Sequence, residues 1–84
     1  IYRVQGKYSK ALEYHEQALT VRQELGDRAG EAESCWNLGL TYNDMGDLAK
    51  AEEHIRLAVE IAEPMGHPEL ERFRDGLKQV RAKR

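Results

Sequence analysis

The sequence predicts an all-α fold made of antiparallel helix–turn–helix repeats, a fragment of an α-solenoid that includes a C-terminal capping helix. Three observations predict this fold class. The chain resembles itself at a shift of 40 residues, apolar residues recur at helical spacing in four segments, and no segment alternates apolar and polar residues as a strand does. With 84 residues, 33% of them charged and 40% hydrophobic, the chain has the length and composition of one small, helix-rich domain.

The internal repeat rests on eight identical pairs, most of them at small or apolar positions, as shared packing requires. These pairs are Tyr2 and Tyr42, Gly6 and Gly46, Lys10 and Lys50, Ala11 and Ala51, Glu13 and Glu53, Ala18 and Ala58, Gly26 and Gly66, and Glu31 and Glu71. Because one helix with its turn takes up about half of that period, each unit should hold two helices.

The first complete helix is predicted over residues 8–25 and ends at Gly26. Glycine readily takes the left-handed conformation that ends a helix. Residues 1–5 are expected to be the tail of an earlier helix, because Gly6 corresponds to Gly46, where the chain is expected to turn.

The second helix is predicted over residues 28–45 and the third over residues 48–64. Asp27 and Asp47 stand just before them, where an aspartate side chain accepts hydrogen bonds from free N–H groups of the first turn. Connections of two to four residues predict that successive helices pack antiparallel.

The fourth helix is predicted over residues 68–82, with Pro68 at its first position. Its apolar residues recur at helical spacing and are expected to dock it onto the third helix; they are Leu70, Phe73, Leu77 and Val80.

Gly39 lies inside the second predicted helix, where glycine costs about 1 kcal/mol relative to alanine. We therefore expect a neighbouring helix to approach its backbone closely, through Ala51 and Ala58 of the third helix.

These residues resemble the tetratricopeptide repeat family, whose unit carries the pattern W-x2-L-G-x2-Y…A-x3-F…A. Leu38-Gly39 and Tyr42 match its first half, and Ala51, Ile55 and Ala58 match its second half. Cys35 occupies the tryptophan position, Trp36 follows one place later, and the proline at the end of the unit, Pro64, is also one place late.

The resemblance implies how the chain divides into units. Residues 1–26 would be a partial repeat, 27–66 a complete repeat and 67–84 the capping helix. A period of 40 exceeds the 34 residues of ordinary repeats and resembles the extended repeats of Pins-like adaptors and kinesin light chains. Without a preceding helix, the first helix should leave an apolar patch uncovered that invites a homodimer, around Tyr8, Leu12, His15 and Leu19.

In function, the resemblance implies a protein–protein interaction module within a larger scaffold or adaptor. The first helix of each unit lines a concave groove that binds a peptide or a helical segment of a partner. Carried over from Gly39, this rule places six residues on the groove: Glu33, Trp36, Asn37, Leu40, Asn43 and Asp44. Flanking residues are expected from the preceding unit, Arg3 and Val4, and from the cap, Arg74, Lys78 and Arg81. The alternatives are that Trp36 packs against a neighbouring helix, and that the chain is a structural or self-associating cap without a peptide ligand.

Catalysis, cofactors and metals are not expected. His15, His54 and His67 have no metal-binding spacing, and the single cysteine, Cys35, has no neighbouring base that the sequence identifies. A net charge of −2 and short apolar runs predict neither nucleic acid nor membrane as a partner. The basic segment 68–84 is expected to be a solvated cap, and one lone cysteine suggests a cytosolic setting.

Overall fold

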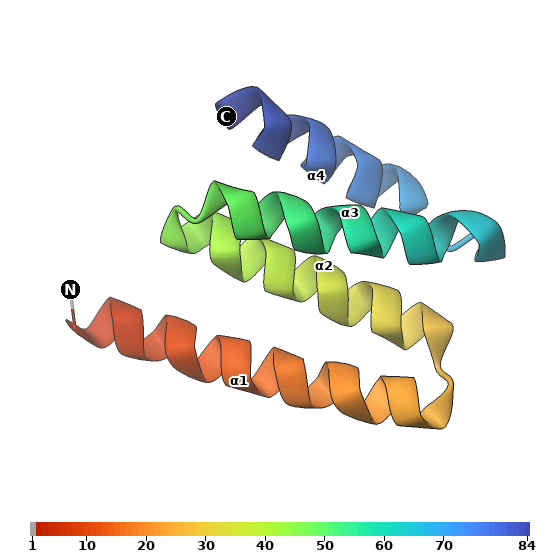
Figure 1. The fold of residues 1–84 in the computed structure, drawn as a ribbon, viewed down its shortest axis with the longest axis horizontal. Helices are drawn as coiled ribbons and strands as arrows, with labels where there is room; N and C mark the ends of the chain where they lie inside the picture. Colours follow the sequence, from red (N-terminus) through yellow and green to blue (C-terminus); the bar gives the residue numbers. More distant parts are fainter. Residues whose placement is uncertain (1) are drawn as a thin grey trace.

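The computed structural model describes the backbone of residues 2–84 and the side chains of residues 6–84. It contains four helices in series, α1 (Tyr2–Leu25), α2 (Arg28–Met45), α3 (Leu48–Met65) and α4 (Leu70–Lys83), and no strand within residues 2–84 (Figure 1). The predicted all-α, helix–turn–helix fold is confirmed.

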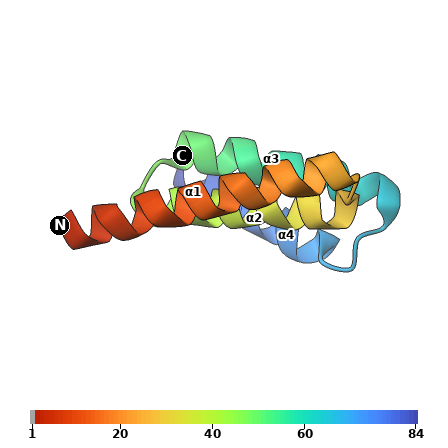
Figure 2. The ribbon, with the colours of Figure 1, turned by 90° about the horizontal axis from the view of Figure 1, so that it is seen from below.

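Each helix packs against the next one in the chain, and successive helices run antiparallel (Figure 1). As a consequence, α2 and α4 run in the same direction, while α1 and α3 run in the opposite one. Viewed at right angles, α3 forms one layer, and α2 and α4 lie next to it in a second layer (Figure 2). The parallel course of α2 and α4 matters below, because it brings equivalent ends of the two helices together.

The predicted helix ends are confirmed by their backbone geometry. Gly26, Gly46 and Gly66 have φ values of 71°, 85° and 62°, the left-handed region that a residue without Cβ enters at no steric cost. Asp27 accepts a hydrogen bond from the N–H of Gly30 at 2.9 Å, and Asp47 from that of Lys50 at 3.2 Å. These caps fix both ends of α2 and the start of α3 within one residue of the predicted bounds.

Helix α1 differs from the prediction, because it continues through Gly6 without a turn. Gly26 and Gly46 are each followed by an aspartate that caps the next helix, whereas Gly6 is followed by Lys7, which has no acceptor for a helix N-terminus. A glycine alone costs a helix only about 1 kcal/mol, so the helix persists through it.

Helix α4 begins at Leu70, two residues later than predicted. Pro68 therefore lies in the turn before the helix and not at its first position. In that turn the buried His67 accepts a hydrogen bond at Nδ1 from the N–H of Glu69, at 3.0 Å, and its ring lies 5.2 Å from that of Phe73. His67 is thus a packing residue that shapes the entry to α4.

The predicted uncovered face of α1 is wrong. Tyr8, Leu12, His15 and Leu19 are half-buried, and Leu19 packs against the core. They follow each other at i, i+4, i+7 and i+11 on the face that α1 needs for packing with α2. The apolar residues left open are on another stripe of the helix: Tyr14, Val21 and Leu25 are 69%, 52% and 76% exposed.

The core lies between α2, α3 and α4 and is built around small residues of α3. Its buried apolar members are Ala32, Cys35, Trp36, Leu38, Ala51, Ile55, Ala58, Ala62, Phe73, Leu77 and Val80. Four of these are alanines, which allow the helix axes to approach. The close approach expected at Gly39 is confirmed, since a Cβ there would overlap Ile55 Cγ1 and lie 3.2 Å from the carbonyl oxygen of Ala51. The closest atoms thus belong to Ile55 and Ala51, and not to Ala58 as expected from the sequence.

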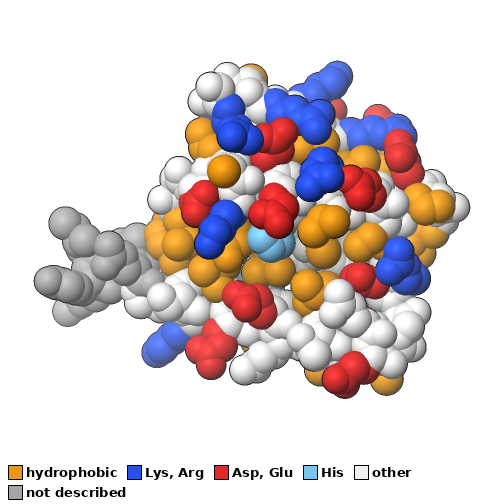
Figure 3. All heavy atoms as spheres, viewed as in Figure 1, with side chains coloured by type: hydrophobic (Ala, Val, Ile, Leu, Met, Phe, Trp, Pro, Cys, Tyr) orange, Lys and Arg blue, Asp and Glu red, His pale blue; other side chains and the backbone are white. Residues whose placement is uncertain are grey.

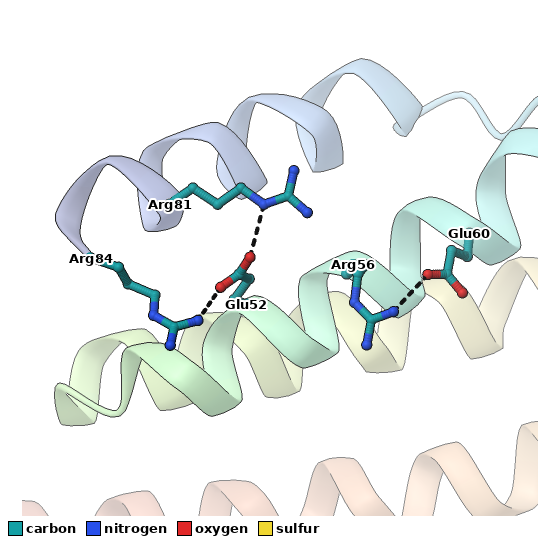
Figure 4. A network of polar contacts seen from close by, with 5 residues as sticks. All are labelled: Glu52, Arg56, Glu60, Arg81 and Arg84. Atoms are coloured by element: carbon teal, nitrogen blue, oxygen red, sulfur yellow. Dashed lines mark hydrogen bonds and ion pairs between the residues drawn. The ribbon is translucent and has the colours of Figure 1, made fainter.

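Ion pairs join the cap helix to α3 across the surface (Figure 4). Arg81 Nε donates to Glu52 Oε2 at 2.9 Å, and Arg84 donates to the other oxygen of that carboxylate. Arg74 donates to Glu63 of α3 at 2.7 Å and to Glu71 at 2.8 Å. Figure 3 shows side chains of both signs mixed over this part of the molecule.

Replacing Gly39 by alanine should lower the free energy of unfolding by about 1–2 kcal/mol, because overpacking against Ile55 outweighs the gain in helix propensity. Gly6→Ala is the matched control: no atom lies within 4 Å of a Cβ there, so it should stabilise the chain by about 0.5–1 kcal/mol. Urea unfolding of both variants measures the two changes, and a stabilising Gly39→Ala would contradict the close approach.

The stability of the chain should fall in acid partly through Glu52. Hydrogen bonds from Arg81, and then from Arg84, hold the pKa of this carboxyl below its ordinary value of 4.5. A carboxyl with a lowered folded-state pKa stabilises the fold above its unfolded pKa, and that contribution is lost as the pH falls through the folded value. Glu52→Gln should therefore flatten the dependence of the unfolding free energy on pH below about 4.5. Glu53→Gln, at an exposed neighbour, should leave that dependence unchanged.

Candidate functional site

Two adjoining hollows form a groove between α2 and α4. The larger, of about 500 Å³, is lined by Trp36, Leu40, Asn43, Ile55, Arg72, Asp75, Gly76, Gln79, Val80 and Lys83. The smaller, of about 220 Å³, is lined by Glu33, Trp36, Asn37, Leu40, Glu69, Arg72 and Phe73. Trp36, Leu40 and Arg72 belong to both, so the hollows are two halves of one groove.

Trp36 forms the floor of this groove and joins α2 to α4. Only 9% of the residue is exposed, and its ring lies 5.0 Å from that of Phe73. A Cβ on Gly76 would overlap Trp36 Cη2 and Cζ3, so the ring rests directly on the backbone of α4. The expectation that Trp36 packs against a neighbouring helix is the one that the structure bears out. Such a tryptophan shapes the groove from below, and its removal would also open the core.

Arg72 lies over the Trp36 ring and lines both hollows. Its guanidinium carbon lies 5.9 Å from the centre of the Trp36 ring, within the range of a cation–π contact. Its one ion pair among residues 6–84 is a loose one, to Glu69 at 3.6 Å, and its side chain is 67% exposed.

Polar groups line the groove above its apolar floor. Lys83 Nζ donates to Asn43 Oδ1 at 3.1 Å and bridges the C-terminal ends of α4 and α2. Asn37, half-buried in α2, and Gln79, exposed in α4, add two more side-chain amides. The groove thus combines an apolar floor with hydrogen-bonding walls, the usual make-up of a ligand site.

The sequence-based candidates on α2 fall mostly on this groove, while those from the flanks do not. Glu33, Asn37, Leu40 and Asn43 line it, together with Trp36. Asp44 lines neither hollow, and its carbonyl oxygen accepts the Tyr8 hydroxyl at 3.3 Å on the α1 side. The side chains of Arg3 and Val4 lie outside the described residues.

On the cap helix, the expected residues lie on other faces. Arg74 and Arg81 pair with glutamates of α3, and Lys78 is exposed outside both hollows. The residues of α4 that reach the groove were missed from the sequence: Arg72, Asp75, Gly76, Gln79 and Lys83. The spacing of Phe73, Leu77 and Val80 was the signal available, because it sets which face of α4 turns inward. This spacing does not indicate which residues beside the buried face of α4 lie next to α2.

Reactive chemistry is not favoured by this arrangement. Burial, reinforced by the nearby Glu31, raises the pKa of the Cys35 thiol to about 11, so it stays protonated and a poor nucleophile. Burial, with a contribution from Arg22, lowers the pKa of His15, on the far side of the molecule from the groove. Within residues 6–84, no three His, Cys, Asp or Glu side chains gather as a metal site would require.

No helix in the described part of the chain is long and apolar enough to cross a membrane.

Gly76→Ala should undock α4, because the added methyl group occupies the space of the Trp36 ring. Trp36 is the single tryptophan of the chain, so its fluorescence should shift to longer wavelength as the ring becomes wet. The free energy of unfolding should fall by about 1–3 kcal/mol. Gln79→Ala, on the same side of α4 but exposed, is the control and should change neither signal. An unchanged emission maximum in Gly76→Ala would contradict the contact.

Comparison with known proteins agrees with the geometry. A family model described as tetratricopeptide repeat matches residues 1–63. A crystal structure of the apo form of RapI superposes on 94% of this chain with a TM-score of 0.85 and 32% sequence identity. The chain spans 29% of the length of RapI. No curated protein sequence matches the chain significantly. The match over three quarters of its length and the shared helical architecture place this chain in the tetratricopeptide repeat family, whose repeats are protein–protein interaction modules and typically non-enzymatic scaffolds.

Proposed function

We propose that the chain binds an extended peptide segment of a partner protein in the groove between α2 and α4, as part of a larger scaffold or adaptor. The observation that carries this proposal is the groove itself: an apolar floor of Trp36, Leu40 and Val80 under a rim of amides and charges. Apolar anchors surrounded by polar groups are typical of the centres of protein interfaces. The free and buried Cys35 of the chain is compatible with the cytosolic setting that the sequence predicts.

An extended segment fits this groove better than a helical one. A helix satisfies its own backbone groups, whereas an extended chain presents free N–H and C=O groups. The side-chain amides of Asn37, Asn43 and Gln79 can both donate and accept hydrogen bonds with such a backbone. Leu40 then supplies an apolar contact for one side chain of the peptide.

The proposal predicts that Asn37→Ala and Leu40→Ala weaken peptide binding. A phage-displayed library of random 12-residue peptides, selected on the chain, supplies the probe. For a selected peptide, Asn37→Ala should raise Kd about fivefold through one lost hydrogen bond, and Leu40→Ala about five- to twentyfold. Circular dichroism checks that both variants fold.

The matched control is Lys78→Ala, an exposed position on α4 outside the groove, which should leave Kd unchanged. Full affinity in both Asn37→Ala and Leu40→Ala would mean that peptides bind elsewhere. Failure to select any peptide would favour a purely structural role.

A second candidate function is self-association through the open face of α1. Tyr14, Val21 and Leu25 form an exposed apolar stripe. Tyr14 and Val21 also line a hollow of about 290 Å³, together with Gln17, Ala18 and Arg22. Burying such a stripe in a homodimer removes apolar surface from water. Sedimentation equilibrium of the chain should then show a dimer that Val21→Glu converts to a monomer. Leu57→Glu, an exposed apolar position on α3, is the control and should not.

A further inference from the structure

We infer that the groove between α2 and α4 is electrically polarised along its length. It selects an extended segment with a basic residue at one end, an apolar residue inside and an acidic residue at the other end. This inference rests on the proposed peptide binding and specifies which peptides fit.

The polarity comes from the parallel course of the two helices. Glu33 near the start of α2 and Glu69 at the start of α4 line the same, smaller hollow. Lys83 at the end of α4 reaches Asn43 near the end of α2, in the larger hollow. Figure 1 shows that α2 and α4 run in the same direction. Antiparallel helices would have mixed these charges, whereas the parallel helices place two carboxylates at one end of the groove and an ammonium at the other.

These end charges are not neutralised by their neighbours. No ion pair of Glu33 or Lys83 is found among residues 6–84, and the pair of Glu69 with Arg72 is long, at 3.6 Å. Of the other basic residues of α4, Arg74 and Arg81 pair with α3, and Lys78 lies outside both hollows. A ligand can therefore pair with Glu33 without breaking an ion pair, and at Glu69 and Lys83 it competes only with the long contact to Arg72 and with the hydrogen bond to Asn43.

The middle of the groove is close to neutral. Arg72 and Asp75 lie one turn apart on α4, carry opposite charges and both line the larger hollow. The floor between them is apolar, with Leu40, Val80 and the edge of Trp36. An uncharged, apolar side chain is therefore the one that loses least hydration when it enters there.

The length of the groove sets the spacing of the peptide residues. Ten residues of helix separate Glu33 from Asn43, which corresponds to about 15 Å along α2. An extended peptide advances about 3.3 Å per residue, so a basic and an acidic residue about five positions apart reach both ends. Leu40, about 10 Å along the same path, faces the peptide roughly three positions from the basic residue.

Other charge patterns fit less well. A uniformly acidic ligand, such as a nucleic acid or an acidic peptide, meets Glu33 and Glu69 at one end of the groove. A polybasic segment meets Lys83 at the other. Like charges brought together repel, so each of these patterns loses at one end what it gains at the other.

The test uses capped hexapeptides with leucine at the fourth position and alanine elsewhere. Positions one and six carry Lys and Glu, Glu and Lys, two Lys, two Glu, or two Gln. Amide chemical shifts of the whole chain, titrated at low salt, yield each Kd. The better of the two mixed-charge peptides should bind about two- to fivefold more tightly than either like-charged peptide, and this gap should shrink at high salt.

A charge reversal in the protein makes the test specific. Lys83→Glu makes both groove ends acidic and should shift the preference to the peptide with two lysines. Lys78→Glu is the matched control, because it makes the same change in net charge on the same helix but outside the groove. This variant should still prefer the mixed-charge peptide.

The outcomes separate this inference from the function on which it rests. If the neutral peptide binds and all charged peptides match it, the polarity is wrong and peptide binding stands. If no peptide, neutral or charged, shifts the signals of Asn37 and Leu40, both are wrong. If Lys78→Glu changes the preference as much as Lys83→Glu, net charge and not the groove is responsible, and the inference falls.

Discussion

The contact of Trp36 with the backbone of α4 at Gly76 is the constraint on which the groove depends. Because Gly76 has no side chain, the indole ring comes close to the backbone of α4 and packs against Phe73. This contact sets the distance between α2 and α4 and brings Arg72 over the ring. A bulkier residue at position 76 would hold the helices apart, and the two hollows would no longer be parts of one groove.

The two outer sides of the array differ in chemistry, and this difference affects how the chain associates. The outer stripe of α4 is charged, and Arg74 and Arg81 pair there with glutamates of α3. The open stripe of α1 is apolar and forms no comparable network among residues 6–84. The proposed association through α1 and the proposed peptide binding between α2 and α4 would therefore use separate surfaces.

Most of the fold could be predicted from the sequence, because its signals are local. Gly26, Gly46 and Gly66 end helices by their own backbone freedom, and Asp27 and Asp47 cap the next helices three residues on. The error at Gly6 has the same local origin, since the repeat suggested a turn but no capping residue follows. The groove residues on α2 could be predicted from the sequence, because Gly39 fixes which face of α2 meets α3.

The sequence by itself determined the helix ends at Gly26, Gly46 and Gly66, the starts of α2 and α3, and the buried faces of α3 and α4, because these depend on contacts within a few residues of chain. Only the tertiary structure decided which polar residues share the groove. A rotation of α4 by a fraction of a turn would have brought Lys78 and Arg81 to α2 in place of Gln79 and Lys83. That rotation is set jointly by Trp36 against Gly76 and by the pairing of Arg74 and Arg81 with α3, contacts between residues 11 to 40 positions apart. Hydrophobic periodicity carries no information on such long-range choices, because it is the same for every rotation that keeps Phe73, Leu77 and Val80 buried.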